Sequence, residues 1–444
     1  MKDEQVEHVC KSIFADVTAC AAAHATCPVG SPLRMLDTGC KELPTGTEKG
    51  IVYAVEFNCS HVRASRCRLD GNRRVSTTEH RVTLSEECKD LSKGLLDSEC
   101  GAMMLFDTLA EAVKVLMESS GDLGHKHTIP VAFVVPFACE QSGPKSARLL
   151  NWTKGFETGR KTNDPVEGLD MATLLDMAFW RKEMNARCVT VLNDGTATML
   201  AAEYERQSRL PPCVVSYLVS VGVNGCFIDP MHEAHKYAGC IVNTELGDYD
   251  RSLPMTDVDL EVDFADQGGH GQQMFEKMVG GGYLGEVCRR LVVKVYQSDA
   301  PTLAWARQSF PTAAAAMVVA DDSADLSRAR SLVQGLWDWT PSQQDLLIVK
   351  DLFTLVFDRS AALSAAAIGA LARATSRLQP AMGGVTVALE GSLHGPHPWY
   401  TELIRQRLNV LLKGNAGFVH LYVTHDSNAK GAAVLAAMLD KSLA

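Results

Sequence analysis

The sequence predicts an α/β protein in which two domains face a shared cleft, with a helix at the N-terminus. Its 444 residues suit two to four domains of about 100–200 residues each. Short apolar strands and amphipathic helices alternate along the chain, which is typical of α/β folds. The second half also repeats the order of the first, with three strands followed by strands that helices separate.

In the first half, strands are expected where apolar residues alternate or run together. These strands cover residues 51–57, 62–69, 81–84, 131–137 and 188–192. Apolar residues at helical spacing predict an amphipathic helix at the N-terminus: Val6, Val9, Cys10, Ile13 and Val17. Further helices are expected around residues 105–116 and after Asp170, which we interpret as an N-cap.

The second half is expected to repeat this pattern. Its strands cover residues 214–221, 226–229, 240–245, 385–390 and 419–423, and its helices cover 272–297, 346–374 and 431–439. Three glycines, Gly280 to Gly282, interrupt the first of these helices at about 1 kcal/mol each relative to alanine. A bend or a close helix contact would explain them.

The predicted domain boundaries follow from these elements. The N-terminal helix and lead-in cover residues 1–45, a small domain covers 46–190 with a C-terminal helix from 431–444, and a large domain covers 191–430. In such sheets, ligands bind beyond the carboxyl ends of the strands, so we expect a site in the cleft.

Composition argues against several classes of protein. The chain is 46% hydrophobic and 22% charged, which is ordinary for a soluble globular protein. A net charge of −10 without a basic run argues against a nucleic-acid partner. The charged start predicts no signal peptide, and the alanine-rich stretch 360–374 is shorter than the roughly 20 apolar residues of a membrane span. The fourteen cysteines are scattered singly, so we expect reduced thiols and a cytoplasmic location.

One apolar strand ends in an ionisable group. In CVTVLNDGTATMLAAEY, residues 188–204, the strand stops at Asn193 and Asp194 and the chain turns directly into a helix. More polar residues stand at strand ends or in apolar surroundings: Thr153, Lys154, Asn224, Glu245 and Glu276. Any one of them could be a solvated or capping residue. Together they suit a ligand covered in hydroxyl groups, because each unpaired polar group costs about 1–3 kcal/mol when buried.

Several segments of the sequence also follow the motifs of a known family in order and spacing. They are RMLDTGCKELPTGTEKG, LLNWTKGF, LNDGTAT, NTELGDYD, FEKMVGGGYLGE, LEGSLHGPHPWY and AKGAAVL. On these segments the chain resembles the eukaryotic hexokinases, from about Leu33 to Leu439. The resemblance implies two actin-like (ribonuclease H-like) α/β domains that flank a deep cleft.

The resemblance also implies an activity. A hexokinase transfers the γ-phosphate of MgATP to the 6-hydroxyl of glucose or a related hexose, and Asp194 would be the general base. The hexose would contact Thr153, Lys154, Asn193, Asp194, Asn224, Glu245 and Glu276. The nucleotide would contact Glu56, Asn58, Ser60, Arg63, Gly222, Gly391 and Ser392. Magnesium would arrive with ATP near Glu56, without a direct protein ligand, and domain closure would exclude water.

The nucleotide side departs from the family pattern. The family's Asp-Leu-Gly-Gly-Thr-Asn-Phe-Arg is here EFNCSHVR, residues 56–63, without the glycines that let backbone N–H groups approach phosphate. Glu56 is one methylene longer than the family's aspartate. The family's Gly-Thr-Gly-Thr-Asn is here residues 220–224, with two valines, and its late Gly-Ser-Gly-Lys is here residues 427–430.

The hexose side departs at two positions. The family's Ser-Phe-Pro is here residues 136–138, and Gly195 replaces the threonine after the general base. Two interpretations therefore stay open: an active hexokinase with weakened nucleotide binding, and a hexose-binding sensor or regulator with little phosphotransferase activity. A purely structural role is disfavoured, because all seven hexose residues are of the family's types.

Overall fold

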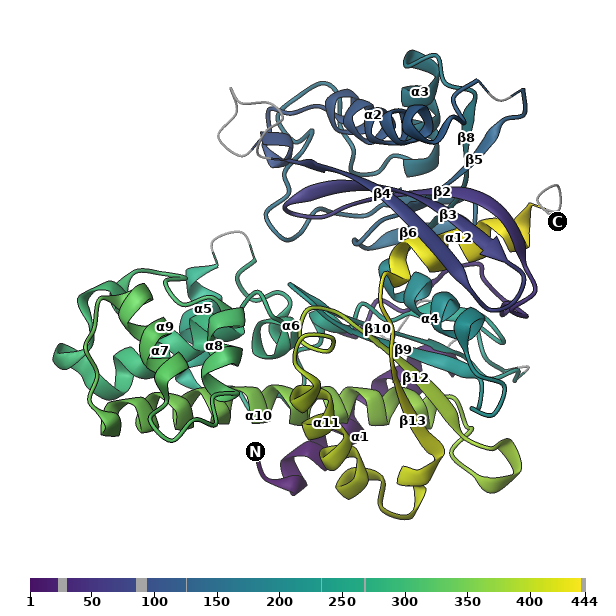
Figure 1. Cartoon of the computed structure of the whole chain (residues 1–444). Helices are drawn as coiled ribbons and strands as arrows, with labels where there is room; N and C mark the ends of the chain where they lie inside the picture. Colours follow the sequence, from purple (N-terminus) through teal and green to yellow (C-terminus); the bar gives the residue numbers. More distant parts are fainter. Residues whose placement is uncertain (23–29, 85–93, 125, 233, 267–268, 441–444) are drawn as a thin grey trace.

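The structure, a computed structural model, describes residues 1–22, 30–84, 94–124, 126–232, 234–266 and 269–440. Two β-sheets lie one above the other, with helices between them and on their outer faces (Figure 1). The expected repetition is confirmed, because five strands of each sheet share one topology and the second sheet only adds β1 at its edge. In each, three antiparallel strands are followed by two strands that run parallel to the first.

The first sheet has the strand order β4-β3-β2-β5-β8. Its strands are β2 (Lys49–Phe57), β3 (His61–Asp70), β4 (Val75–Thr83), β5 (Ile129–Val134) and β8 (Ala186–Leu192). The expected third strand at 81–84 was too short, since β4 pairs with β3 from Val75 onward. A two-stranded sheet of β6 (Cys139–Gly143) and β7 (Ser146–Leu149) was not expected, because its short segments lack an apolar run.

The second sheet has the order β1-β11-β10-β9-β12-β13. Its strands are β1 (Leu36–Asp37), β11 (Ile241–Asn243), β10 (Val223–Ile228), β9 (Cys213–Val219), β12 (Val385–Glu390) and β13 (Val419–Val423). Strand β9 is buried along its whole length, which explains its continuous apolar run. The expected strands at 214–221 and 240–245 end earlier, so residues 220–222 and Glu245 lie in turns beyond the sheet.

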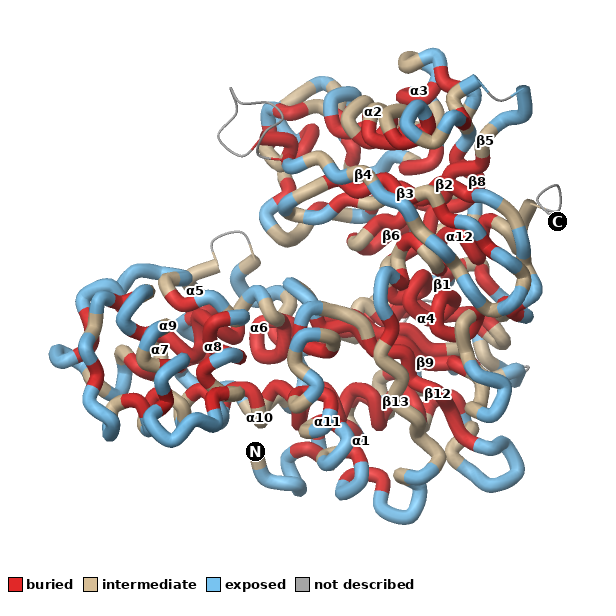
Figure 2. The backbone as a smooth tube through the Cα atoms, viewed as in Figure 1, coloured by how far each residue is buried: buried red, intermediate tan, exposed pale blue. Residues whose placement is uncertain are grey.

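Helices form three layers around the two sheets (Figure 1). Helices α2 (Ala102–Ser120) and α3 (Met171–Arg181) cover the first sheet, and Asp170 caps α3 as expected. Helices α4 (Asp194–Glu205) and α12 (Ser427–Leu439) share a core with both sheets. Helices α1 (Asp3–Ala22), α10 (Gln343–Ala374) and α11 (Pro398–Leu412) cover the second sheet, and the apolar face expected for α1 is buried. Figure 2 shows this buried centre in red.

The domain boundaries stay a prediction. Helix α12 contacts both α4 and β2, so it joins the two halves of the molecule. It begins at Ser427, before the expected start at residue 431, and the last residues of the predicted segment, 441–444, lie outside the described part of the chain.

The helix expected over residues 272–297 is broken at the glycine run that interrupts its sequence pattern. It is divided into α6 (Met274–Val279) and α7 (Leu284–Tyr296), and the glycine run lies between them. The N–H of Gly281 donates to the carbonyl of Ser220 at 2.7 Å, and that of Gly282 donates to Val221 at 2.9 Å. A Cβ on Gly281 would lie 2.6 Å from the Ser220 oxygen, so the backbones can meet only without side chains. This side of the molecule is completed by α5 (Asp257–Ala265), α8 (Thr312–Val319) and α9 (Ser327–Trp337).

Helix α10 is long and apolar enough to cross a membrane by length and composition alone, with a mean hydropathy of 1.4 in its most apolar window. However, 83% of that window is buried inside the protein, so the helix packs here as a core element. Every cysteine that the structure describes is a free thiol, as expected for reduced cysteines, and Cys27 and Cys88 lie outside the described residues.

Candidate functional site

A cavity of about 500 Å³ opens where strands of both sheets end. All fourteen residues that the sequence assigns to hexose or nucleotide line it. The hexose set is Thr153, Lys154, Asn193, Asp194, Asn224, Glu245 and Glu276; the nucleotide set is Glu56, Asn58, Ser60, Arg63, Gly222, Gly391 and Ser392. Residues that are far apart in the chain therefore meet in one place. Their roles stay a prediction, since lining a cavity does not by itself show what a residue binds.

The turn from β8 to α4 places the predicted base, Asp194, at the N-terminus of α4. Asn193 is the N-cap of α4, and its Oδ1 accepts the N–H of Gly195 at 2.9 Å. The same N–H reaches Asp194 Oδ1 at 2.8 Å. A Cβ at position 195 would lie 2.6 Å from the Sγ of Cys226, which explains why glycine stands where the family has threonine. The helix N-terminus favours the ionised form of Asp194.

A chain of amides links the sheet ends below the cavity. Asn224 Nδ2 donates to Asn193 Oδ1 at 3.1 Å and to Asn243 Oδ1 at 2.9 Å. Asn243 Nδ2 in turn donates to Glu245 Oε1 at 2.7 Å. These bonds fix the orientation of the Asn193 and Asn224 amides, which line the cavity, and amides suit recognition of hydroxyl groups that both donate and accept. Asn243 was missed by the sequence analysis, although it stands two residues before Glu245 on β11.

Three carboxylates face one lysine on the hexose side. Burial by itself would lower the pKa of Lys154, but Glu276, Asp194 and Glu245 together raise it above its ordinary value. Lys154 Nζ also donates to the carbonyl of Pro136 at 3.2 Å. Lys154 is therefore charged at neutral pH.

Burial raises the pKa of all three of these carboxyl groups. The pKa of Asp194 is raised by burial, against the attraction of Lys154. The pKa of Glu245 is raised to about 7 by burial, despite the hydrogen bond from Asn243. The pKa of Glu276 is also raised by burial. Its Oε2 accepts the N–H of Val223 at 2.9 Å, while its Oε1 is buried without a hydrogen-bond partner among the residues described. That oxygen can accept a hydrogen bond from a hydroxyl group.

The nucleotide side is built around Glu56 at the end of β2. Both of its oxygens are engaged, one by the guanidinium of Arg63 and the other by Asn428 Nδ2 at 2.5 Å. Arg63 Nη1 also donates to Asp426 Oδ1 at 2.9 Å, so these contacts join the first sheet to the start of α12. The extra methylene of Glu56 thus brings its carboxylate to Asn428, in the segment that replaces the family's Gly-Ser-Gly-Lys.

A second set of contacts crosses the cavity near the hexose residues. Arg34 Nε donates to Asp248 Oδ2 at 3.0 Å, and its Nη1 donates to Asn151 Oδ1 at 2.9 Å. All three residues line the cavity. None of the three was predicted as a site residue, since Arg34 stands in the lead-in segment and its partners lie far away in the chain. Their position inside the quoted motifs was the available signal.

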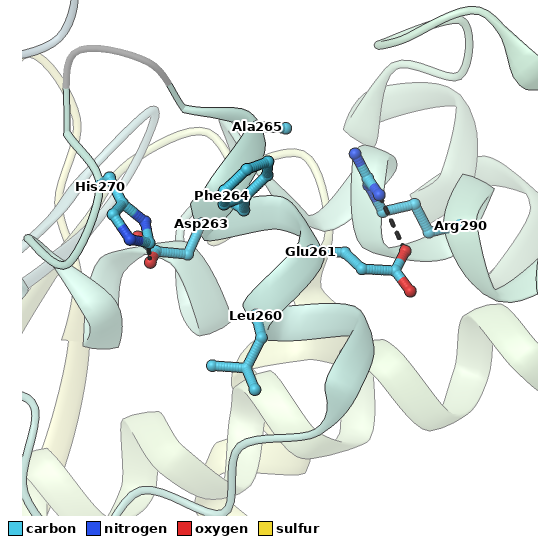
Figure 3. A pocket seen from close by; sticks show the side chains of 7 residues that line it. All are labelled: Leu260, Glu261, Asp263, Phe264, Ala265, His270 and Arg290. Carbon is cyan, nitrogen blue, oxygen red and sulfur yellow. Dashed lines mark hydrogen bonds and ion pairs between the residues drawn. The ribbon is translucent and has the colours of Figure 1, made fainter.

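Another hollow of about 540 Å³ lies on α5 (Figure 3). Its large apolar residues, Leu260 and Phe264, are 54% and 78% exposed. Its ionisable groups pair with each other: Glu261 with Arg290 at 2.9 Å and Asp263 with His270 at 2.8 Å (Figure 3). None of the predicted site residues lines it, so we place the chemistry in the cavity between the sheets.

Comparison with known proteins agrees with this geometry. Two family models, both described as hexokinase, match residues 1–204 and 214–438. A hexokinase of Plasmodium falciparum is 35% identical over 407 residues, which are 91% of this chain and 82% of that protein. A hexokinase of Toxoplasma gondii is 35% identical over 413 residues, which are 92% of this chain and 87% of that protein.

Solved structures show the same relationship. A crystal structure of a hexokinase superposes with a TM-score of 0.88 at 34% identity and covers 99% of this chain and 96% of that one. The hexokinase of Schistosoma mansoni, in complex with glucose, superposes with a TM-score of 0.83 at 25% identity and the same coverage. The expected pair of actin-like domains is thereby confirmed. The chain belongs to the hexokinase family.

Proposed function

We propose that this hexokinase transfers the γ-phosphate of MgATP to the 6-hydroxyl of glucose or a related hexose, with Asp194 as the general base. The observation that carries the proposal is the convergence of all seven predicted hexose residues on one cavity, with Asp194 in its wall. The alternative, a hexose-binding sensor, rests on the altered phosphate segments. Membership of the hexokinase family favours the enzyme.

The hexose would be held by groups that the structure already orients. Asn193 and Asn224 are locked by their shared hydrogen bond, and the free Oε1 of Glu276 is an acceptor. Glu245 offers a second acceptor, since only its Oε1 takes the Asn243 amide. Because each such group loses water when a ligand enters, a hydroxyl partner for each one is required for tight binding.

Asp194 would accept the proton of the 6-hydroxyl. Its Oδ1 accepts the Gly195 N–H, and we assign the proton to Oδ2. Burial raises the pKa of Asp194, which makes the carboxylate a stronger base than a solvated aspartate. Lys154 opposes this shift, because its positive charge favours the ionised carboxylate. The reaction then depends on positioning and charge, as is general for phosphoryl transfer.

The nucleotide side has acceptors that suit hydrated magnesium. Asn428 Oδ1 and Glu390 Oε2 are buried without a hydrogen-bond partner among the described residues, and Glu390 lies beside Gly391 and Ser392 in the cavity wall. Magnesium keeps most of its water in such sites, and those waters donate hydrogen bonds. The ion that arrives with ATP neutralises the phosphate charge, while Glu56, Asn428 and Glu390 would hold its water shell.

The test compares Asp194→Asn with Asp351→Asn, a matched change at an exposed residue of α10. We expect Asp194→Asn to lower kcat for sugar 6-phosphate formation by about 10²–10⁴, because asparagine cannot accept the proton. Glucose affinity by calorimetry should change much less, and Asp351→Asn should match the wild type. A wild type that binds glucose but forms no more product than Asp194→Asn would instead establish the sensor.

We also propose a cytoplasmic location, which the free thiols support and cell fractionation would test.

A further inference from the structure

The turn between β2 and β3 lies in the wall of the cavity and contains Asn58, Cys59, Ser60 and His61. It is a tight hairpin, since Phe57 pairs with Val62 and the N–H of Asn58 donates to the carbonyl of His61 at 3.0 Å. The thiol of Cys59 donates to the carbonyl of Lys154 at 3.4 Å. The turn is therefore held by a backbone hydrogen bond between its two ends and by the bond from Cys59 to the hexose residue Lys154.

Three donors of this turn converge on one atom. Asn58 Oδ1 accepts the N–H of Ser60 at 2.8 Å, the Oγ–H of Ser60 at 2.9 Å and the N–H of His61 at 3.0 Å. Consecutive backbone N–H groups that point to one spot form a concave anion site, in which phosphate oxygens commonly bind. Here the carboxamide oxygen of the turn's own first residue takes that spot.

We infer that Asn58 is an internal competitor for phosphate: its carboxamide oxygen occupies the anion position of the β2–β3 turn and must leave before a nucleotide phosphate can bind there. The inference rests on the proposed function, because it takes the phosphate from ATP. It explains what the loss of the family's first glycine does, since glycine has no side chain that could fill the position.

The structure shows that this displacement is feasible. Asn58 is exposed, so its side chain can rotate into solvent without disturbing the core. The turn keeps its backbone bond and its contact through Cys59 when the side chain leaves. The released donors would pair with a charged phosphate oxygen, which forms stronger hydrogen bonds than a neutral amide. Competition would therefore weaken nucleotide binding without preventing it.

The experiment uses the full chain at saturating glucose and measures binding of the magnesium complex of a non-hydrolysable ATP analogue by calorimetry. Asn58→Ala removes the competing oxygen, and Asn58→Gly restores the family residue. Asn58 is not one of the described residues with a positive φ, so alanine at position 58 can keep the native backbone. The control is Asn72→Ala, the same change in the exposed turn between β3 and β4, outside the cavity.

We expect both Asn58 variants to bind the analogue about tenfold more tightly than the wild type, the net value of the hydrogen bonds released. Glucose affinity should stay within about twofold in all variants, and Asn72→Ala should bind the analogue like the wild type. Unchanged or weaker binding by Asn58→Ala would overturn the inference. So would tighter binding by Asn58→Gly alone, because that gain would come from backbone freedom.

The two proposals fail in different ways. If the wild type forms sugar 6-phosphate but Asn58→Ala binds the analogue no better, the enzyme stands and the competition by Asn58 is refuted. If the wild type forms no product and binds no analogue but Asn58→Ala binds it, the competition stands and the proposed activity of the natural chain fails.

Discussion

Glu245 offers a prediction in which stability and ligand binding move in opposite directions. The residue has a left-handed backbone with φ 52°, just beyond β11, and its Oε1 accepts Asn243 Nδ2 at 2.7 Å. Burial raises its pKa from 4.5 to about 7. Glu245→Gln removes the charge and retains an oxygen for Asn243. Lys154 keeps its other two partners, Asp194 and Glu276.

The sign follows from proton linkage. A carboxyl group with a raised pKa binds its proton more tightly in the folded state, so the folded protein loses stability as the pH rises from 4.5 through about 7. At about 1.4 kcal/mol for each pKa unit, ionised Glu245 lowers the free energy of unfolding by roughly 3 kcal/mol above pH 7. Without glucose, Glu245→Gln should therefore be more stable than the wild type at pH 8, by up to this amount. The two proteins should converge below about pH 4.5.

The assay is urea denaturation of both proteins at several pH values between 4.5 and 8, with glucose calorimetry at pH 8. Glucose should bind about 10–100-fold more weakly to Glu245→Gln, because a hydrogen bond to a charged acceptor is lost. Glu118→Gln, at an exposed position of α2, is the matched control for removing one negative charge. A variant that is less stable than the wild type at pH 8, or shifted equally at all pH values, would refute this reasoning.

Three further predictions concern packing, a buried charge and ligand linkage. Gly431→Ala should lower the free energy of unfolding by about 1–3 kcal/mol or more, because its Cβ would overlap the Ala197 carbonyl. The control, Gly335→Ala on α9, has open space around the new Cβ and should be neutral or slightly stabilising. Denaturation curves of the two variants test this. Lys277→Met should cost about 1–3 kcal/mol by the same assay, since buried Asp263 loses its 2.7 Å ion pair with Lys277 and retains His270 and the Gly271 N–H. Glucose at 100 times its Kd should stabilise the wild type by about 2.7 kcal/mol in thermal unfolding, and an unchanged Tm would contradict binding in the cavity.

Most strands of the two large sheets could be predicted from the local pattern of apolar residues. Strand β9 is an apolar run because both of its faces are buried, and the N-cap at Asp170 is read from a single side chain. The glycine run indicated an interruption between α6 and α7, but the segment that the glycines contact could not be predicted from it. The glycines at 280–282 are needed where their backbone meets residues 220 and 221, far away in the chain.

The candidate site shows the same division. Asn193 and Asp194 stand out locally, since a polar pair ends an apolar strand and starts a helix. Arg34 gives no such signal, and its part in the cavity depends on Asp248 and Asn151 coming within hydrogen-bond distance. Likewise, the order of residues 56–63 shows that the glycines are missing, but only the folded turn shows what Asn58 does there.

The sequence alone determined the kinds of chemical group and their order along the chain: acids and amides at strand ends, and altered phosphate segments between them. These are local properties, since apolar period and residue type need no neighbour to be read. The tertiary structure decided how the groups act on each other. Burial beside Asp194 and Lys154, and the bond from Asn243, set the state of Glu245, because charge and hydrogen bonding depend on distances between residues that are remote in the chain.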